Sequence, residues 1–338
     1  MKIPNLFVTA ALTMGGFHLY AQELGVEYTA ELQSNFSDCN FVNLLRLNGE
    51  MALSKSLTLE ASTISIAKTR KERIIDDLQN FSNIEEENLP LALAVCGANW
   101  QVGDSHSIFI GVRNMNEDYF TSPTTSFFNN SSCGIFPTIS SNYSIANYPL
   151  ASVGLHYRYE HGSPSAKNGG HTETFTLQAS LYNGTGYNRF TGRDNIFRFC
   201  PKSDGVFAIA EAQCQQNENL YFLGTSLYCN DGISVTPWAY SEFHATKQFT
   251  FLAGLSHAFG SNIICKDFFG FGAHFRRGKT EIGIFTDYAK FADTAEWATE
   301  LTCKYQANNR ISIQPTTHFI TTAGEIYCVL TLRLKAEL

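Results

Sequence analysis

Apolar and polar side chains alternate in short segments along the whole chain after residue 22. In the segment 295–305, Trp297 and Leu301 share one face, whereas Glu296 and Glu300 share the opposite face. Successive side chains of a β-strand point to opposite sides, so this pattern predicts strands with one apolar and one polar face. Only residues 69–80 could hold a short helix. We count sixteen alternating segments, at roughly 24–34, 41–53, 56–66, 91–102, 106–115, 150–160, 172–182, 205–214, 219–229, 235–245, 248–258, 266–276, 280–289, 294–305, 309–319 and 325–335.

The connections between these segments fall into two classes of length. Every second connection is short, with 161–171 as the exception, and the others are mostly longer. Three of the longer connections stand out, at 67–90, 116–149 and 183–204. A soluble sandwich has no reason to sort its loops by length, whereas an outer-membrane barrel has short periplasmic turns and long external loops. We therefore expect an all-β fold, a transmembrane antiparallel β-barrel of about 16 strands, with the N- and C-termini periplasmic.

The composition agrees with such a barrel. Charged residues make up only 16% of the 338 residues, against about 25% in an average soluble protein. The mean hydropathy of −0.13 is too low for a bundle of membrane helices. Aromatic residues make up 13% of the chain, which excludes disorder. The net charge of −7 gives no support for a nucleic-acid partner.

The N-terminus predicts export. Lys2 precedes an apolar stretch, Leu6 to Phe17, and Ala21 supplies a small residue for cleavage. We interpret residues 1–21 as a signal peptide and 22–338 as a single outer-membrane β-barrel domain; the alternative for 1–21 is a buried N-terminal helix. A signal peptide alone leaves secretion, the periplasm and the outer membrane open, and the barrel pattern favours the outer membrane of a Gram-negative bacterium.

Five short stretches, in order over roughly 40–338, resemble the carbohydrate-selective porins, the OprB-type family. The first three are Phe127-Phe128-Asn129-Asn130-Ser131-Ser132-Cys133-Gly134, Asn147-Tyr148-Pro149-Leu150-Ala151-Ser152-Val153-Gly154 and Leu181-Tyr182-Asn183-Gly184. The last two are Ile313-Gln314-Pro315 and Leu332-Arg333. The resemblance implies a sixteen-stranded outer-membrane channel for glucose and other sugars. The chain departs from the family pattern at Thr316, at Ala323-Gly324 and at Leu338, which is not aromatic.

Candidate pore-lining residues come from the polar face of the strands and from the 116–149 loop. Arginine and carboxylate side chains can hydrogen-bond sugar hydroxyls, and repeated weak contacts let a solute enter and leave. The candidates are Arg113, Glu117, Asp118, Asn129, His156, Arg158, Glu211, Glu242, Arg310 and Arg333. An ion-pair ladder that holds the wall explains each wall residue equally well. The 116–149 loop is either an inward-folded constriction or an external cap, and Trp238 either stacks on a sugar or sits in an interfacial girdle.

These features predict a passive porin for sugars and other small solutes. No motif joins a nucleophile to a base, so we expect no enzyme activity, no cofactor and no metal. The expected partners are mono- or oligosaccharides, outer-membrane lipid and the barrel-assembly machinery. The alternatives are a general non-selective porin, an outer-membrane barrel enzyme acting on lipid or glycan, and a secreted carbohydrate-binding β-protein. The nine cysteines are an odd number, so they cannot all pair within one chain, and both loop disulfides and free thiols stay open.

Overall fold

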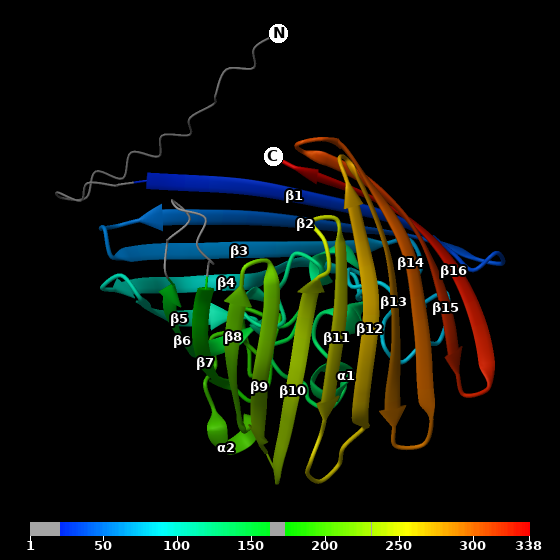
Figure 1. Cartoon of the computed structure of the whole chain (residues 1–338). Coiled ribbons are helices and arrows are strands. Elements are labelled where there is room, and N and C mark those ends of the chain that lie inside the picture. Colours follow the sequence, from blue (N-terminus) through cyan, green and yellow to red (C-terminus); the bar gives the residue numbers. More distant parts are fainter. Residues whose placement is uncertain (1–20, 163–172, 231) are drawn as a thin grey trace.

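Sixteen antiparallel strands close into one barrel in the computed structural model, which describes residues 21–162, 173–230 and 232–338 (Figure 1). The sixteen-stranded barrel predicted from the alternation is therefore confirmed. The first eight strands are β1 (Ala21–Ser34), β2 (Cys39–Ala52), β3 (Leu57–Lys68), β4 (Leu89–Val102), β5 (His106–Arg113), β6 (Ser152–Gly162), β7 (Glu173–Asn183) and β8 (Val206–Gln216). The others are β9 (Asn219–Cys229), β10 (Ile233–His244), β11 (Phe249–His257), β12 (Cys265–Arg277), β13 (Thr280–Phe291), β14 (Ala295–Asn308), β15 (Ile311–Thr322) and β16 (Glu325–Glu337).

The barrel closes between its first and last strands. β1 pairs with β2 on one side and with β16 on the other, in a register that places Leu32 opposite Leu332. The chain end joins the same seam, because the amides and carbonyls of Val26 and Leu338 hydrogen-bond each other at 3.1 and 2.9 Å. Closure leaves no unpaired strand edge, which a sheet surrounded by hydrocarbon requires. None of the helices within the described residues is long and apolar enough to cross a membrane.

The two faces of the strands follow the predicted alternation. On β14 the side chains of Trp297 and Leu301 point outward and are 54% and 50% exposed, whereas Glu296 and Glu300 point inward and are fully buried. The outer surface is thus apolar along the strands. The polar face is turned to the interior, as expected for a barrel in lipid.

The loops are sorted by length between the two ends of the barrel, as predicted. We call the end where β1 begins and β16 ends the terminal end; turns such as 217–218, 278–279 and 309–310 lie there. The connections 69–88, 114–151 and 184–205 lie at the opposite end. The predicted signal peptide lies outside the described residues except for Ala21, at which β1 begins, and the 161–171 connection lies largely outside them.

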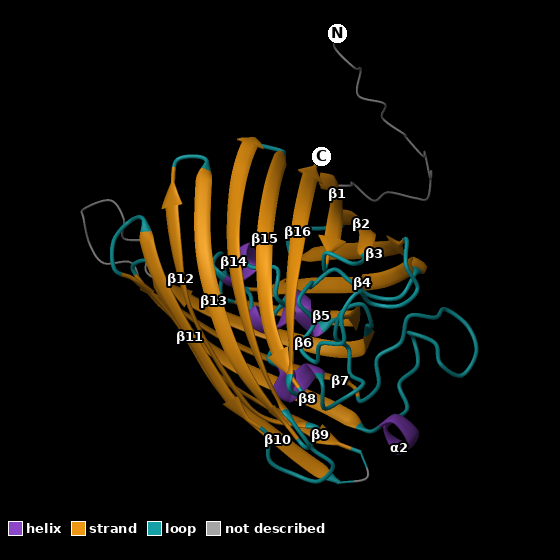
Figure 2. Ribbon diagram, turned by 90° about the vertical axis from the view of Figure 1, so that its right-hand side faces the viewer, coloured by secondary structure: helices purple, strands orange, loops and turns teal. Residues whose placement is uncertain are grey.

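Two long connections fold into the barrel, and we call them the first inner loop (69–88) and the second inner loop (114–151). The second contains η1 (Met115–Glu117), η2 (Thr125–Phe127), η3 (Ser131–Cys133) and α1 (Pro137–Ser140). These short helices lie within the ring of strands, whereas α2 (Pro201–Asp204) lies outside it (Figure 2).

The short helix that residues 69–80 could hold is absent from the first inner loop. The amides of Leu78 and Gln79 instead donate to the carboxylate of Glu296 on β14, at 2.7 and 3.0 Å. The amide of Phe81 donates to the side chain of Asp77 at 2.7 Å. Side-chain acceptors replace the helical carbonyls here, so the segment is irregular.

Candidate functional site: the barrel interior

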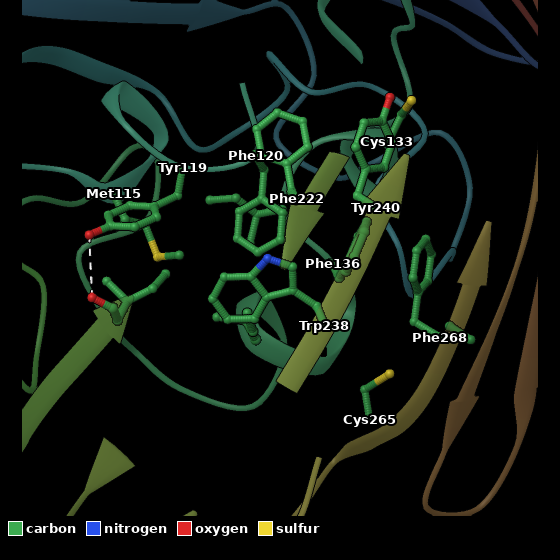
Figure 3. Close-up of a cluster of buried hydrophobic side chains, with 14 of the residues drawn as sticks. Met115, Tyr119, Phe120, Cys133, Phe136, Phe222, Trp238, Tyr240, Cys265 and Phe268 are labelled. Carbon is green, nitrogen blue, oxygen red and sulfur yellow. Dashed lines mark hydrogen bonds between the residues drawn. The ribbon is translucent and has the colours of Figure 1, made fainter. Parts of the chain in front are cut away.

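A cluster of aromatic side chains packs the second inner loop against β8–β13. The ring centroid of Phe120 lies 4.8 Å from that of Trp238 on β10, and Phe136 stacks on Phe268 of β12 at 4.5 Å. Figure 3 shows Phe120 beside Trp238, with Tyr240 and Cys133 at the same cluster. Trp238 is 1% exposed and points inward, so it belongs to no interfacial girdle. This half of the interior is therefore packed with protein.

Carboxylates of the wall hold the second inner loop by its polar groups. Glu300 on β14 accepts the backbone N–H of Asn129 at 2.9 and 3.0 Å and that of Asn130 at 2.7 Å. Glu242 on β10 accepts the hydroxyls of Ser122 and of Thr124, the latter at 2.8 Å. Hydrogen bonds to a charged acceptor are stronger than neutral ones. The loop is thus fixed to two separate parts of the wall.

The two inner loops are also bonded to each other. The amide of Asn83 donates to the carbonyl of Asn129 at 2.8 Å, and the amide of Ser131 donates to the carbonyl of Asn80 at 3.1 Å. Each loop is also anchored to β14, the first through Glu296 and the second through Glu300. The two inner loops therefore form one body inside the barrel.

A third anchor joins the first inner loop to the closing seam. Ser82 donates to Glu31 on β1 at 2.6 Å, and Glu31 also pairs with Arg333 on β16 at 2.7 Å. Glu31 is fully buried, so this pair is shielded from water. The seam of the barrel and the first inner loop therefore share one polar network.

A polar cavity of about 1130 Å³ runs between the inner loops and the wall formed by β12–β16 and β1–β4. It reaches from the terminal-end turns, at Gly278 and Arg310, to both inner loops. Where it meets the loops, it is bordered by an ion pair of 2.7 Å between Arg46 on β2 and Glu117. Arg333, Glu86 and Tyr148 also line this stretch.

Three of the ten predicted pore-lining residues border this cavity, namely Glu117, Arg310 and Arg333. Glu242 and Asn129 contribute to the anchors of the second inner loop described above. Arg158 pairs with the exposed Glu160 at 2.7 Å and borders a smaller cavity of about 610 Å³.

The remaining four predicted residues, Arg113, Asp118, His156 and Glu211, hold the start of the second inner loop. Arg113 at the end of β5 binds Asp118 through two bonds of 2.7 Å. His156 lies 3.7 Å from the same carboxylate, and Gln178 bridges the carbonyl of Asp118 and the side chain of Glu211 at 2.7 and 2.9 Å. The structure brings these four together as a support for the loop.

Arg46, Glu86 and Tyr148 were not among the predicted residues. Arg46 could have been found from the sequence, because it alternates with Leu45 and Leu47 and so belongs to the polar face of β2. Glu86 and Tyr148 lie in irregular loops, where no periodicity marks the side chains that face the interior.

No metal or redox site emerges in the part of the chain that the structure describes. There, no group of three or more His, Cys, Asp or Glu side chains is placed to hold a metal ion. All nine cysteines lie in this part of the chain, and each is free. The loop disulfides left open by the sequence are therefore not formed.

Burial raises the pKa of Glu86 to about 7, against the smaller effects of Arg73 and Lys68, which lower it. Its carboxyl group is thus largely protonated at pH 5.5 and ionised at pH 8.5. We expect the cavity to gain one negative charge over this range, so that cations pass more readily relative to anions as the pH rises through about 7. The measurement is the reversal potential of single channels in a KCl gradient at both pH values. Glu86→Gln should flatten this pH dependence, and a slope that survives the substitution would contradict the assignment.

Comparison with known proteins supports the fold. No protein-family profile and no curated protein sequence matches the chain. The structure is similar to the high-pH structure of Pseudomonas putida OprB, with a TM-score of 0.76, 13% identity and 94% coverage of each chain. It is also similar to an anion-selective porin from Comamonas acidovorans, with a TM-score of 0.57, 11% identity and coverage of 94% of this chain and 99% of that chain. The resemblance to carbohydrate-selective porins seen in the sequence is thus matched by the fold.

Proposed function

We propose that this protein is an outer-membrane porin that lets sugars and other small solutes diffuse passively through the barrel. The observation that carries the proposal is the polar cavity of about 1130 Å³ that extends from the terminal-end turns to both inner loops. The apolar outer face supports a position in lipid, and the sorting of loops by length supports a periplasmic terminal end. A porin of this kind is no enzyme and needs no cofactor, because the solute gradient drives the flux.

The residues beside the inner loops suit a sugar. Arg46, Glu117 and Arg333 supply charged donors and acceptors for hydroxyl groups, and Tyr148 supplies an aromatic surface for the apolar face of a sugar ring. Each group also bonds to protein, as Arg46 does to Glu117, so the side chains are held in place between solutes. Contacts that are weak and repeated allow a solute to enter and still leave.

Liposome swelling with purified, refolded protein tests the proposal. We expect entry of neutral monosaccharides and progressively slower entry of larger oligosaccharides. Heat-unfolded protein is the control. Absence of swelling from a demonstrably folded barrel would overturn the porin assignment and favour a barrel enzyme acting on lipid or glycan.

A matched pair of solutes separates a sugar-selective pore from a general one. Glucose and sorbitol have nearly equal size, but only glucose offers a ring face to Tyr148. An aromatic contact contributes on the order of 1 kcal/mol, so we expect glucose to enter several times faster than sorbitol. Tyr148→Ala should remove this difference. Equal rates of the two solutes in the unsubstituted protein would identify a general porin.

A further inference from the structure

One wall of the cavity carries an excess of basic side chains. Six of them line it on the terminal-end half of β12–β16 and their turns: Arg276, Lys279, Lys304, Arg310, Arg333 and Lys335. The same wall contributes only two acidic residues to the lining, Glu281 and Glu337. We call this wall the basic strip. It contrasts with the chain as a whole, whose net charge is −7.

Three side chains of the basic strip form no ion pair, although Arg276 lies opposite Glu281, a carboxylate that pairs with His274 and Lys304. Arg276, Lys279 and Arg310 form no ion pair with any carboxylate of the described residues, and all three are exposed. Lys279 donates to the carbonyl of Ala307 at 3.0 Å, which fixes its position and leaves its charge in place. By contrast, Lys335 pairs with Glu27 at 3.2 Å and with Glu337 at 2.8 Å.

The three unpaired charges lie at the entrance of the cavity, where a solute passes them. They occupy the turns 278–279 and 309–310 and the strand ends beside them, at the mouth of the cavity on the terminal end. Like charges within about 8–10 Å of one another reinforce their potential at physiological ionic strength. A cleft with low-dielectric walls concentrates such a field and raises the local concentration of the opposite charge.

The rest of the cavity is rich in amide side chains. Asn80, Asn83, Asn116 and Asn147 of the inner loops line it, as do Gln306 and Gln314 of the wall. An amide offers both hydrogen-bond donors and an acceptor and so matches a hydroxyl group. The cavity therefore combines uncompensated positive charge with many partners for hydroxyl groups.

We propose that the basic strip makes this pore prefer polyhydroxylated anions, such as sugars that carry a carboxylate or a phosphate. The inference rests on the proposed porin function and names the solute class of the same cavity. The anionic group of the solute is attracted to Arg276, Lys279 and Arg310 at the mouth, and its hydroxyl groups bind the amides nearer the inner loops.

Single-channel recordings in planar bilayers test this preference with three solutes built on one sugar ring. Glucuronate is the anion, glucosamine is the cation, and glucose 6-phosphate separates a phosphate from a carboxylate. We expect the reversal potential to show that glucuronate, glucose 6-phosphate or both permeate several times more readily than glucosamine. A preference for glucosamine would overturn the proposal.

Charge reversal identifies the residues responsible. The triple variant Arg276→Glu, Lys279→Glu, Arg310→Glu should reverse the sign of the selectivity. Arg277→Glu is the matched control, because Arg277 neighbours Arg276 but does not line the cavity, and we expect it to keep the anion preference. Unchanged selectivity in the triple variant, or an equal change in the control, would overturn the role of the strip.

Swelling with neutral glucose keeps this test separate from that of the porin function. It should persist in the unsubstituted protein and in the Arg277→Glu control. Glucose entry without anion preference would reject the basic strip alone. Absence of both glucose entry and conductance would reject the pore itself.

Discussion

Replacing Glu300 by alanine should loosen the second inner loop and lower the free energy of unfolding by about 3 kcal/mol, because two buried backbone N–H groups lose their acceptor at a cost of about 1–3 kcal/mol each. Glu300 is fully buried and accepts the amides of Asn129 and Asn130. Asn130 and Ser131 line the cavity, so their release from the wall should also raise the single-channel conductance. Urea unfolding in lipid vesicles and bilayer recordings measure the two effects.

Two further variants make this prediction specific. Glu300→Gln keeps one oxygen acceptor, so we expect a smaller loss of stability than with alanine. Glu218→Ala changes an exposed carboxylate in the turn between β8 and β9 and should leave both quantities unchanged. If Glu300→Ala behaves like Glu218→Ala, the anchor at Glu300 contributes nothing to the position of the loop.

Valine at Gly224 should be the second strongly destabilising change. A Cβ atom at this position of β9 would overlap the ring of Trp238 and lie 2.8 Å from the carbonyl oxygen of Ala210. Trp238 cannot move freely, because Phe120 of the second inner loop packs against it. Overpacking of this kind costs about 1–3 kcal/mol or more, and we expect a value near the upper end.

Gly25 on β1 provides the matched control for this substitution. A Cβ atom there would meet only the side chain of Asn48, at 3.8 and 3.9 Å, which are ordinary contacts. We expect Gly25→Val to change the free energy of unfolding by less than about 1 kcal/mol, since valine also favours strands. Equal losses in the two variants, measured by urea unfolding in vesicles, would show that the packing around Trp238 is not tight.

The strands could be predicted because the information that defines them is local. Each needs only alternation over about ten residues, and this placed Trp297 outside and Glu296 inside without knowledge of any partner strand. The same alternation placed Glu211 and Glu242 inside. Arg46 carries the same signal. The short helix that 69–80 could hold does not form, because amides of this segment bond to Glu296, more than two hundred residues away.

The number of strands, their faces and the end of the barrel at which the long loops lie follow from the sequence alone, because a period of two residues and the spacing of turns are properties of the chain. Which inward polar residues face the cavity and which hold a loop becomes evident only in the folded barrel. Glu300 and Arg310 look alike in the pattern, yet Glu300 receives amides from 170 and 171 positions away, and Arg310 lines the cavity. That difference depends on where two inner loops fold, and their position is set by hydrogen bonds and aromatic contacts between residues distant in sequence.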